Sequence, residues 1–198
     1  MMGDSDKKQY SSFVKIETYK AAATGVNAFV VYYRDDNTDE MYTSIIRVMP
    51  GATTLEWEVQ LHGIPAGGFS KTDGKEVVVN WELLDFANAD TFYTDSNGLE
   101  MQKRVLNQRP DFTLVTDEFA SSNYYPINSA IAIRNEATSM QLTVMNDRSQ
   151  GGSVLADGSV ELMQNRRLKN DDWRGVGEPL NETNSSNEGI QVNTRYFL

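Results

Sequence analysis

The side chains best suited to chemistry gather in one stretch of the sequence, NDRSQGGSVLADGSVELMQNRRLKNDDWRGVGEP. An ordinary turn needs one glycine and one or two polar residues, and this stretch has many more of both. Within it, Arg174 lies between Trp173 and Gly175. A guanidinium held in a glycine-flanked loop is a pre-oriented donor that can bind hydroxyls or a carboxylate but cannot act as a base. A solvated loop arginine is the alternative interpretation.

Two adjacent carboxylates, Asp171 and Asp172, precede this arginine. The carboxyl pair of a glycosidase stands roughly 5 to 9.5 Å apart across the scissile bond, whereas adjacent side chains usually point apart. We therefore interpret the pair as a turn cap and as counter-charge to Arg166 and Arg167, and not as an acid and base.

Composition excludes most catalytic chemistry. The chain of 198 residues has no cysteine and one histidine, His62. Disulfides, zinc–cysteine sites, a thiol nucleophile and a two-histidine zinc site are therefore impossible within it. We therefore expect no metal site in this chain, and most catalysis that depends on His or Cys is excluded.

The charge balance limits the partners. Eighteen Lys and Arg against 28 Asp and Glu give a formal charge of −10, which repels a phosphate backbone. No apolar run approaches the roughly 18 residues of a membrane span. We expect neither nucleic acid nor a membrane as a partner.

The elements that must position these side chains have a hydrophobic period of two, which is typical of half-buried strands. Apolar and polar residues alternate over Thr53–His62 and Met140–Met145. Further strands are predicted over 27–33, 42–48, 76–84, 130–134 and 159–164, with turns such as Asn97-Gly98 between them. Many strands without a convincing helix predict an all-β fold of antiparallel sheets in a sandwich.

Domain boundaries follow from composition. Residues 1–11 have no apolar pattern, so we expect a flexible N-terminus or one left by cloning, followed by one β-sandwich domain over 12–198. Residues 181–188, NETNSSNE, indicate a flexible loop with N-glycosylation sequons at Asn181 and Asn184. The final QVNTRYFL is expected to begin a last strand that is cut short.

Aromatic residues in two of the polar segments suggest a second function. Tyr124 and Tyr125 in NYYPIN, together with Trp173, could stack on a sugar. Tyrosines at such a position also close a core with their hydroxyls at the rim, and core closure is favoured for this pair. The alternative function is a free-standing carbohydrate-binding β-sandwich, and a third is a pure scaffold.

Six motifs occur in a distinctive order. They are FYTDSNG (92–98), NYYPIN (123–128), DRSQGG (147–152), DGSVELM (157–163), RRL (166–168) and DDWRGVGEPL (171–180). The series closely resembles the C-terminal β region of the class II α-mannosidases, glycoside hydrolase family 38, and the lysosomal branch in particular. The resemblance extends from about residue 44 onward, and residues 1–40 fit poorly.

The resemblance implies a large antiparallel super-sandwich of the galactose mutarotase-like type. It also implies a parent enzyme that removes α-linked mannose from N-glycans with retention, in a lysosomal, vacuolar or other secretory-pathway compartment. The zinc ion and the Asp nucleophile of such an enzyme belong to its N-terminal catalytic domain. The chain would be an inactive fragment whose partners are that domain and mannose-containing glycans.

The resemblance also implies roles for individual residues. The arginine of DD-x-RG lies on the rim of the family's sugar pocket, which assigns Arg174 to the rim, with Asp172 and Gly175 beside it. Trp173 departs from the small or acidic residue familiar at that place, so substrate preference does not carry over. The expected members of the supporting loops are Asp147, Arg148, Gln150, Gly151, Gly152, Arg167 and Asp171.

Overall fold

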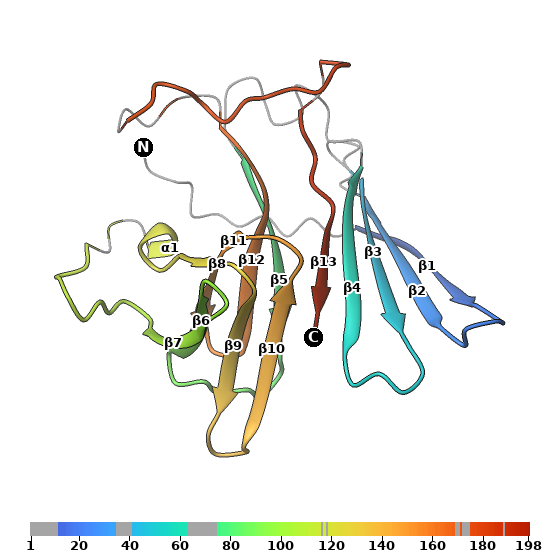
Figure 1. Ribbon diagram of the computed structural model, residues 1–198, viewed down its shortest axis with the longest axis horizontal. Coiled ribbons are helices and arrows are strands. Elements are labelled where there is room, and N and C mark those ends of the chain that lie inside the picture. The colour runs from blue at the N-terminus through green and yellow to red at the C-terminus, as the bar shows by residue number, and fades with distance from the viewer. Residues whose placement is uncertain are drawn as a thin grey trace. The chain divides into compact units, whose positions relative to one another are not determined.

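The computed structural model describes residues 12–34, 41–62, 75–115, 117, 119–168, 171, 175–187 and 189–198. These residues form thirteen strands and one four-residue helix, α1 (Phe119–Ser122) (Figure 1). The predicted all-β class is confirmed. Within the same ranges, no helix is long and apolar enough to span a bilayer.

The chain divides into two compact units. The first comprises Lys7–Val77 and Gln164–Phe197, and the second comprises Val78–Met163. Two strands, β5 (Lys75–Glu82) and β12 (Ser159–Arg167), each contribute residues to both units.

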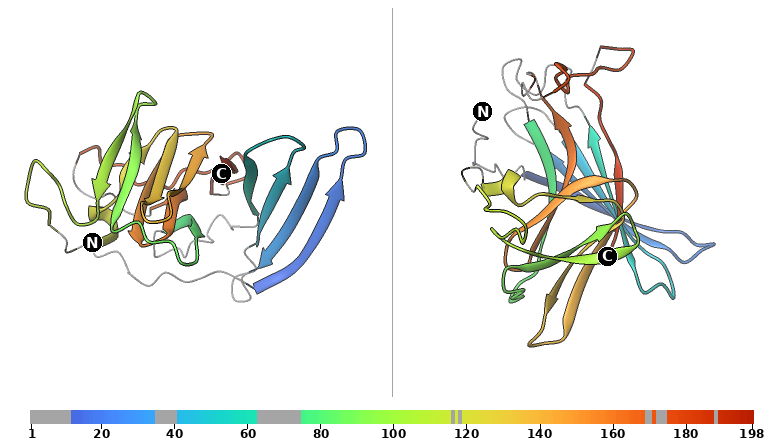
Figure 2. Two further views of the ribbon diagram at one scale, coloured as in Figure 1. Left: turned by 90° about the horizontal axis from the view of Figure 1, so that it is seen from below. Right: turned by 60° about the vertical axis from the view of Figure 1, so that its left-hand side comes forward.

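The first unit contains an antiparallel sheet in the order β1-β2-β3-β4-β13. The neighbouring strands β1 to β4 are seen side by side in both views of Figure 2. The bounds are β1 (Ser12–Lys20), β2 (Asn27–Arg34), β3 (Met41–Val48), β4 (Leu55–His62) and β13 (Thr194–Phe197).

Strand β4 shows why the alternating pattern forms this sheet. Val59 and Leu61 are buried on one face, 4% and 6% exposed. On the other face the Arg47 guanidinium lies 2.7 Å from carboxylate oxygens of both Glu56 and Glu58. Each face therefore has the neighbours that its residue types require.

The second unit contains two antiparallel sheets, in the orders β10-β9-β6-β7 and β5-β12-β11-β8. The bounds are β6 (Thr91–Ser96), β7 (Glu100–Val105), β8 (Tyr125–Ile127), β9 (Ala130–Asn135), β10 (Met140–Asn146) and β11 (Gln150–Ala156). The predicted turn at Asn97-Gly98 joins β6 to β7 with positive φ at both residues, 52° and 72°, as a tight hairpin requires.

The core of the second unit lies between its two sheets. Phe92 of β6 is fully buried and meets Tyr125 of β8 edge-to-face, with ring centroids 5.6 Å apart. Seven further aliphatic side chains from both sheets are at most 1% exposed: Ile127, Ile131, Ile133, Val144, Val154, Val160 and Leu162. This packing makes the unit a β-sandwich.

Two of the strands absent from the sequence prediction, β1 and β11, have a clear physical reason for being missed. Strand β1 pairs with β2 through a register shift between Phe13 and Lys15, and such a bulge interrupts the alternation that reveals a strand. Strand β11 begins at Gln150, inside the glycine-rich DRSQGG motif. Glycine normally weakens a strand, so its sequence indicated a loop.

Candidate functional site

The DRSQGG motif starts at a turn after β10. Arg148 and Asp147 are exposed there, and Arg148 Nε lies 3.1 Å from Asp147 Oδ1. The Asn146 side chain holds the turn, because its Nδ2 donates to the carbonyls of Ile127 and Arg148. The charged half of the motif therefore belongs to the turn that connects β10 to β11.

The second half of the motif belongs to a strand, although we expected a supporting loop. Gly151 lies opposite Pro126 and Gly152 lies opposite Tyr125. A Cβ on Gly152 would lie 2.5 Å from Leu162 Cδ2 and 2.7 Å from Ile127 Cγ1. The glycine is required because side chains of the two neighbouring strands in the same sheet, β12 and β8, occupy the space that a Cβ would need.

Tyr124 covers the neighbouring glycine. A Cβ on Gly151 would lie 3.1 Å from Tyr124 Cδ1. The Tyr124 hydroxyl donates to Glu161 Oε1 at 2.5 Å, and Glu161 is only 2% exposed. Gln150 Nε2 donates to the carbonyl of Met163 at 2.9 Å. The structure thus brings Tyr124 against Gly151 and onto the buried Glu161 carboxylate.

Tyr125 has a different environment. It is 5% exposed, and the guanidinium carbons of Arg104 and Arg109 lie 4.3 and 3.9 Å from its ring centroid. Cations close to an aromatic ring are attracted by its quadrupole. The ring is therefore engaged by Phe92 and by the two arginines.

Asp95, in FYTDSNG, accepts hydrogen bonds from two turns. Its Oδ1 accepts the backbone N–H groups of Asn128, Ser129 and Ala130 at 2.8, 3.0 and 3.2 Å, and its Oδ2 accepts that of Gly98 at 2.8 Å. Burial pulls the pKa of Asp95 upward, but these N–H donors outweigh burial and leave the pKa below its ordinary value.

The segment that follows β12 belongs to the first unit. Leu168 N donates to the carbonyl of Leu180 at 2.9 Å, and Arg167 Nη1 donates to the carbonyl of Glu182 at 2.6 Å. These bonds close the intervening segment into a loop. Asp171 is half-buried and Gly175 is exposed.

Several expected site residues have other positions. Asp172, Trp173 and Arg174 lie outside the described residues. Asn181 and Asn184 of the sequons are exposed, and Asn184 Oδ1 accepts the Ser186 backbone N–H at 2.9 Å. Arg167, Asp171 and Gly175 belong to the first unit, whereas Tyr124, Tyr125 and DRSQGG belong to the second. Among the described residues, no three side chains of His, Cys, Asp or Glu converge as metal ligands.

The sandwich fold and the order of the motifs define a β-domain of the glycoside hydrolases. Residues 7–174 match the family described as "Glycosyl hydrolases family 38 C-terminal domain". The chain therefore belongs to glycoside hydrolase family 38, in its C-terminal domain.

Curated relatives agree with this membership. The chain is 44% identical to the lysosomal alpha-mannosidase of Bos taurus over 174 residues, which are 87% of this chain and 16% of that protein. It is 46% identical to the lysosomal alpha-mannosidase of Homo sapiens over 79% of this chain and 14% of the relative. An alpha-mannosidase of Arabidopsis thaliana is 40% identical over 75% of this chain and 14% of its own length. The chain thus spans about one sixth or less of these relatives.

Proposed function

We propose that the chain is the β-sandwich domain of an α-mannosidase that hydrolyses α-linked mannose in N-glycans, and that it carries no catalytic residue itself. The observation that carries this proposal is the match to the family's C-terminal domain over residues 7–174. The relatives are several times longer than the chain, which leaves room for a catalytic domain elsewhere in such a polypeptide. The proposed compartment is the lysosome, after the names of these relatives.

The proposed contribution of the chain is a loop arginine at the wall of the sugar pocket. In the sequence, Arg174 falls between Leu168 and Leu180, whose backbone groups are joined by a hydrogen bond. Arg167, bonded to the carbonyl of Glu182, supports that loop from its base. A loop closed at both ends holds a donor fork with less entropic cost than a free segment.

Zinc chemistry is assigned to the rest of the polypeptide. The family implies a zinc ion, but the described residues of this chain offer no cluster of ligands for it. The single histidine and the absence of cysteine also fit poorly with a zinc site. We therefore derive no step of the reaction through zinc within this chain.

Substitution of the arginine in the longer α-mannosidase tests the role. Arg174→Ala removes one charged hydrogen bond, worth about 1.5–3 kcal/mol. We expect kcat/KM for an aryl α-mannoside to fall about 10- to 150-fold. Arg174→Lys keeps the charge but loses the fork of parallel N–H donors. Its kcat/KM should therefore lie between the values of Arg174→Ala and of the unsubstituted enzyme.

A matched control is Arg195→Ala, which removes an exposed arginine with ion-pair distances of 3.9–4.0 Å to Glu58 and Glu56. It should leave kcat/KM unchanged. An unchanged rate in Arg174→Ala would contradict the proposed role of the loop. Hydrolysis of the aryl α-mannoside by the 198-residue chain alone would contradict the non-catalytic assignment.

A further inference from the structure

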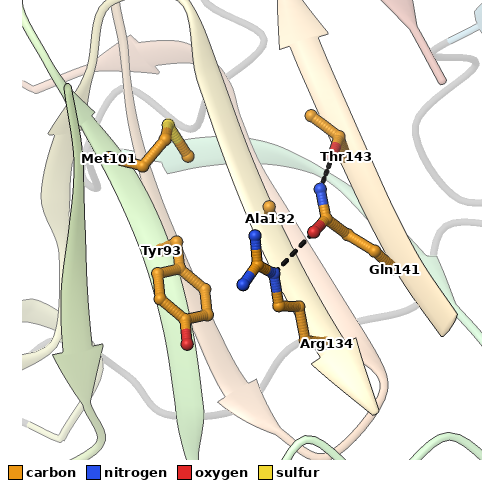
Figure 3. Close-up of a pocket in the computed structure, with 6 residues that line it drawn as sticks. All are labelled: Tyr93, Met101, Ala132, Arg134, Gln141 and Thr143. Carbon is orange, nitrogen blue, oxygen red and sulfur yellow. Dashed lines mark hydrogen bonds between the residues drawn. The ribbon is translucent and has the colours of Figure 1, made fainter. Parts of the chain in front are cut away.

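A groove lies on the outer face of the β10-β9-β6-β7 sheet, away from every motif residue discussed above except Tyr93 (Figure 3). Its cavity volume is about 110 Å³. Pockets that enclose a drug-sized ligand are typically about 300–1,000 Å³, so this shallow groove can hold no more than a single ring, and only in part. Its lining comes from four strands: Tyr93, Met101, Ala132, Arg134, Gln141 and Thr143.

Strand register places these side chains in two opposed walls. Tyr93 lies opposite Ala132, and Ala132 lies opposite Thr143. The small Ala132 side chain leaves a low floor between the phenol ring on one side and the polar pair Gln141 and Thr143 on the other. Met101 of β7 is 44% exposed beside the ring. The groove therefore has an apolar half and a polar half.

The polar half is ordered by a chain of hydrogen bonds. Gln141 Nε2 donates to Thr143 Oγ1 at 2.7 Å, which turns Gln141 Oε1 toward the arginine. Arg134 Nε then donates to that oxygen at 2.6 Å. The guanidinium is fixed beside the Tyr93 ring, 5.0 Å from the ring centroid. Figure 3 shows these side chains converging on the floor.

Among the described residues, no carboxylate pairs with Arg134, and its hydrogen bond to Gln141 uses Nε and not the terminal amino groups. The Arg134 side chain is exposed, so these amino groups are accessible from solvent. Two donor groups are thus presented to a ligand in a fixed geometry.

We propose that this groove binds a pyranose ring of a glycan, with the C–H face of the sugar on Tyr93, Met101 and Ala132 and its hydroxyl oxygens on Arg134. A pyranose has both an apolar face and a set of acceptor oxygens, which matches the two halves of the groove. A simple anion would bind the guanidinium but would leave the apolar half of the groove in contact with water. The proposal goes beyond the proposed function and does not rest on it.

Methyl resonances in the groove provide a local measurement on the full 198-residue chain. Methyl α-mannopyranoside is titrated to about 100 mM, and the NMR signals of the Met101 and Ala132 methyl groups are followed. We expect saturable shifts of both signals and none of Met49, which lies in the first unit. Absence of a saturable shift would overturn the proposal.

Variants identify the contributing side chains. Arg134→Ala should weaken binding at least tenfold. Gln141→Met keeps the arginine but removes the oxygen that orients it, and should weaken binding a few-fold. Both residues are exposed, so folding is not at risk. Arg148→Ala, an exposed arginine of the same unit, should bind as the unsubstituted chain does. Equal binding by Arg134→Ala would overturn the assignment.

Two further experiments test whether a simple anion or another part of the protein occupies the groove instead. Sodium acetate titrated in place of the mannoside tests a simple anion, and shifts with acetate alone would overturn the proposal. In the longer polypeptide, the Met101 methyl signal should be broadened by a soluble paramagnetic probe. Protection from that probe would show that protein covers the groove, and would also overturn the proposal.

Discussion

Gly152 is a residue whose role is steric and whose replacement has a calculable consequence. Its position in β11 is opposite both Leu162 of β12 and Tyr125 of β8. A Cβ there would also lie 3.1 Å from the carbonyl oxygen of Glu161. A backbone atom cannot rotate away as a side chain can, so the strands themselves must separate.

We expect Gly152→Ala to destabilise the chain by about 1–3 kcal/mol, the usual cost of overpacking a core. Urea denaturation measures the change. Gly177→Ala is the matched control, because no heavy atom lies within 4 Å of its added Cβ, and it should change stability little. Equal stability of Gly152→Ala and the unsubstituted chain would contradict the packing argument.

Asp95 makes stability depend on pH. Its folded pKa is below the ordinary value of 3.8, so its contribution is present above that pH and is lost as pH falls through the folded pKa. Asp95→Asn places an amide N–H₂ against backbone donors and should cost about 1–3 kcal/mol at neutral pH. The difference between the two chains should stay constant from about pH 7 to 5 and shrink below about pH 4.

Urea denaturation at a series of pH values checks this dependence. Asp111→Asn changes the same charge at an exposed position and serves as the control, with little effect at any pH. A difference between Asp95→Asn and the unsubstituted chain that grows with acidification would contradict the assigned sign.

Arg174 was singled out from the sequence by its glycine-flanked, acid-backed setting, and its role stays a prediction because it lies outside the described residues. Glu161 was missed, because a carboxylate in a strand is normally solvated and only the tertiary structure brings the Tyr124 hydroxyl to it. A glutamate between Val160 and Leu162, which are both buried, was the available signal.

At the scale of the element, polar side chains connect strands that the sequence separates widely. Gln164 of β12 is 4% exposed, and its Nε2 donates to the carbonyls of Val59 and Val192 at 3.0 and 2.7 Å. The Tyr196 hydroxyl donates to Gln164 Oε1 at 3.0 Å. One amide thereby joins β12 to β4 and β13 within the first unit.

Gln164→Leu has a similar volume but leaves three buried polar groups without this partner. We expect a loss of roughly 2–4 kcal/mol, because an unsatisfied buried group costs about 1–3 kcal/mol. The midpoint of urea denaturation should fall with little change in its slope. Gln108→Leu, at an exposed position, should leave the midpoint nearly unchanged, and a similar fall in that control would contradict the explanation.

The strands differ in how clearly the sequence predicts them. Thr53–His62 predicted β4 (Leu55–His62) because one face is apolar and the other charged. Pro126 cannot donate a backbone hydrogen bond, which suits the edge position that β8 has in its sheet. Strand β11 was hidden, because its glycines are there for the close approach of β8 and β12, and a sequence does not show that approach.

At the scale of the whole molecule, the family was readable because six motifs keep their order, and residues 7–174 confirm it. The match begins well before the residue near 44 from which the resemblance was evident. The division into two units was not predicted. It depends on contacts between distant segments, whereas composition changes little across Val77–Val78 and Met163–Gln164.

The arrangement of segments has a consequence for biosynthesis. The second unit is one continuous segment, whereas the strands of the first unit come from both sides of it. On the ribosome, β4 is complete more than a hundred residues before Tyr196, its partner at Trp57, has been added. Closing so long an intervening segment is entropically costly and slow. The edge of β4 that later pairs with β13 therefore stays unpaired while the whole second unit is synthesised. An unpaired strand edge can associate with strands of other chains, so this part of the nascent chain has the greatest need of protection from aggregation.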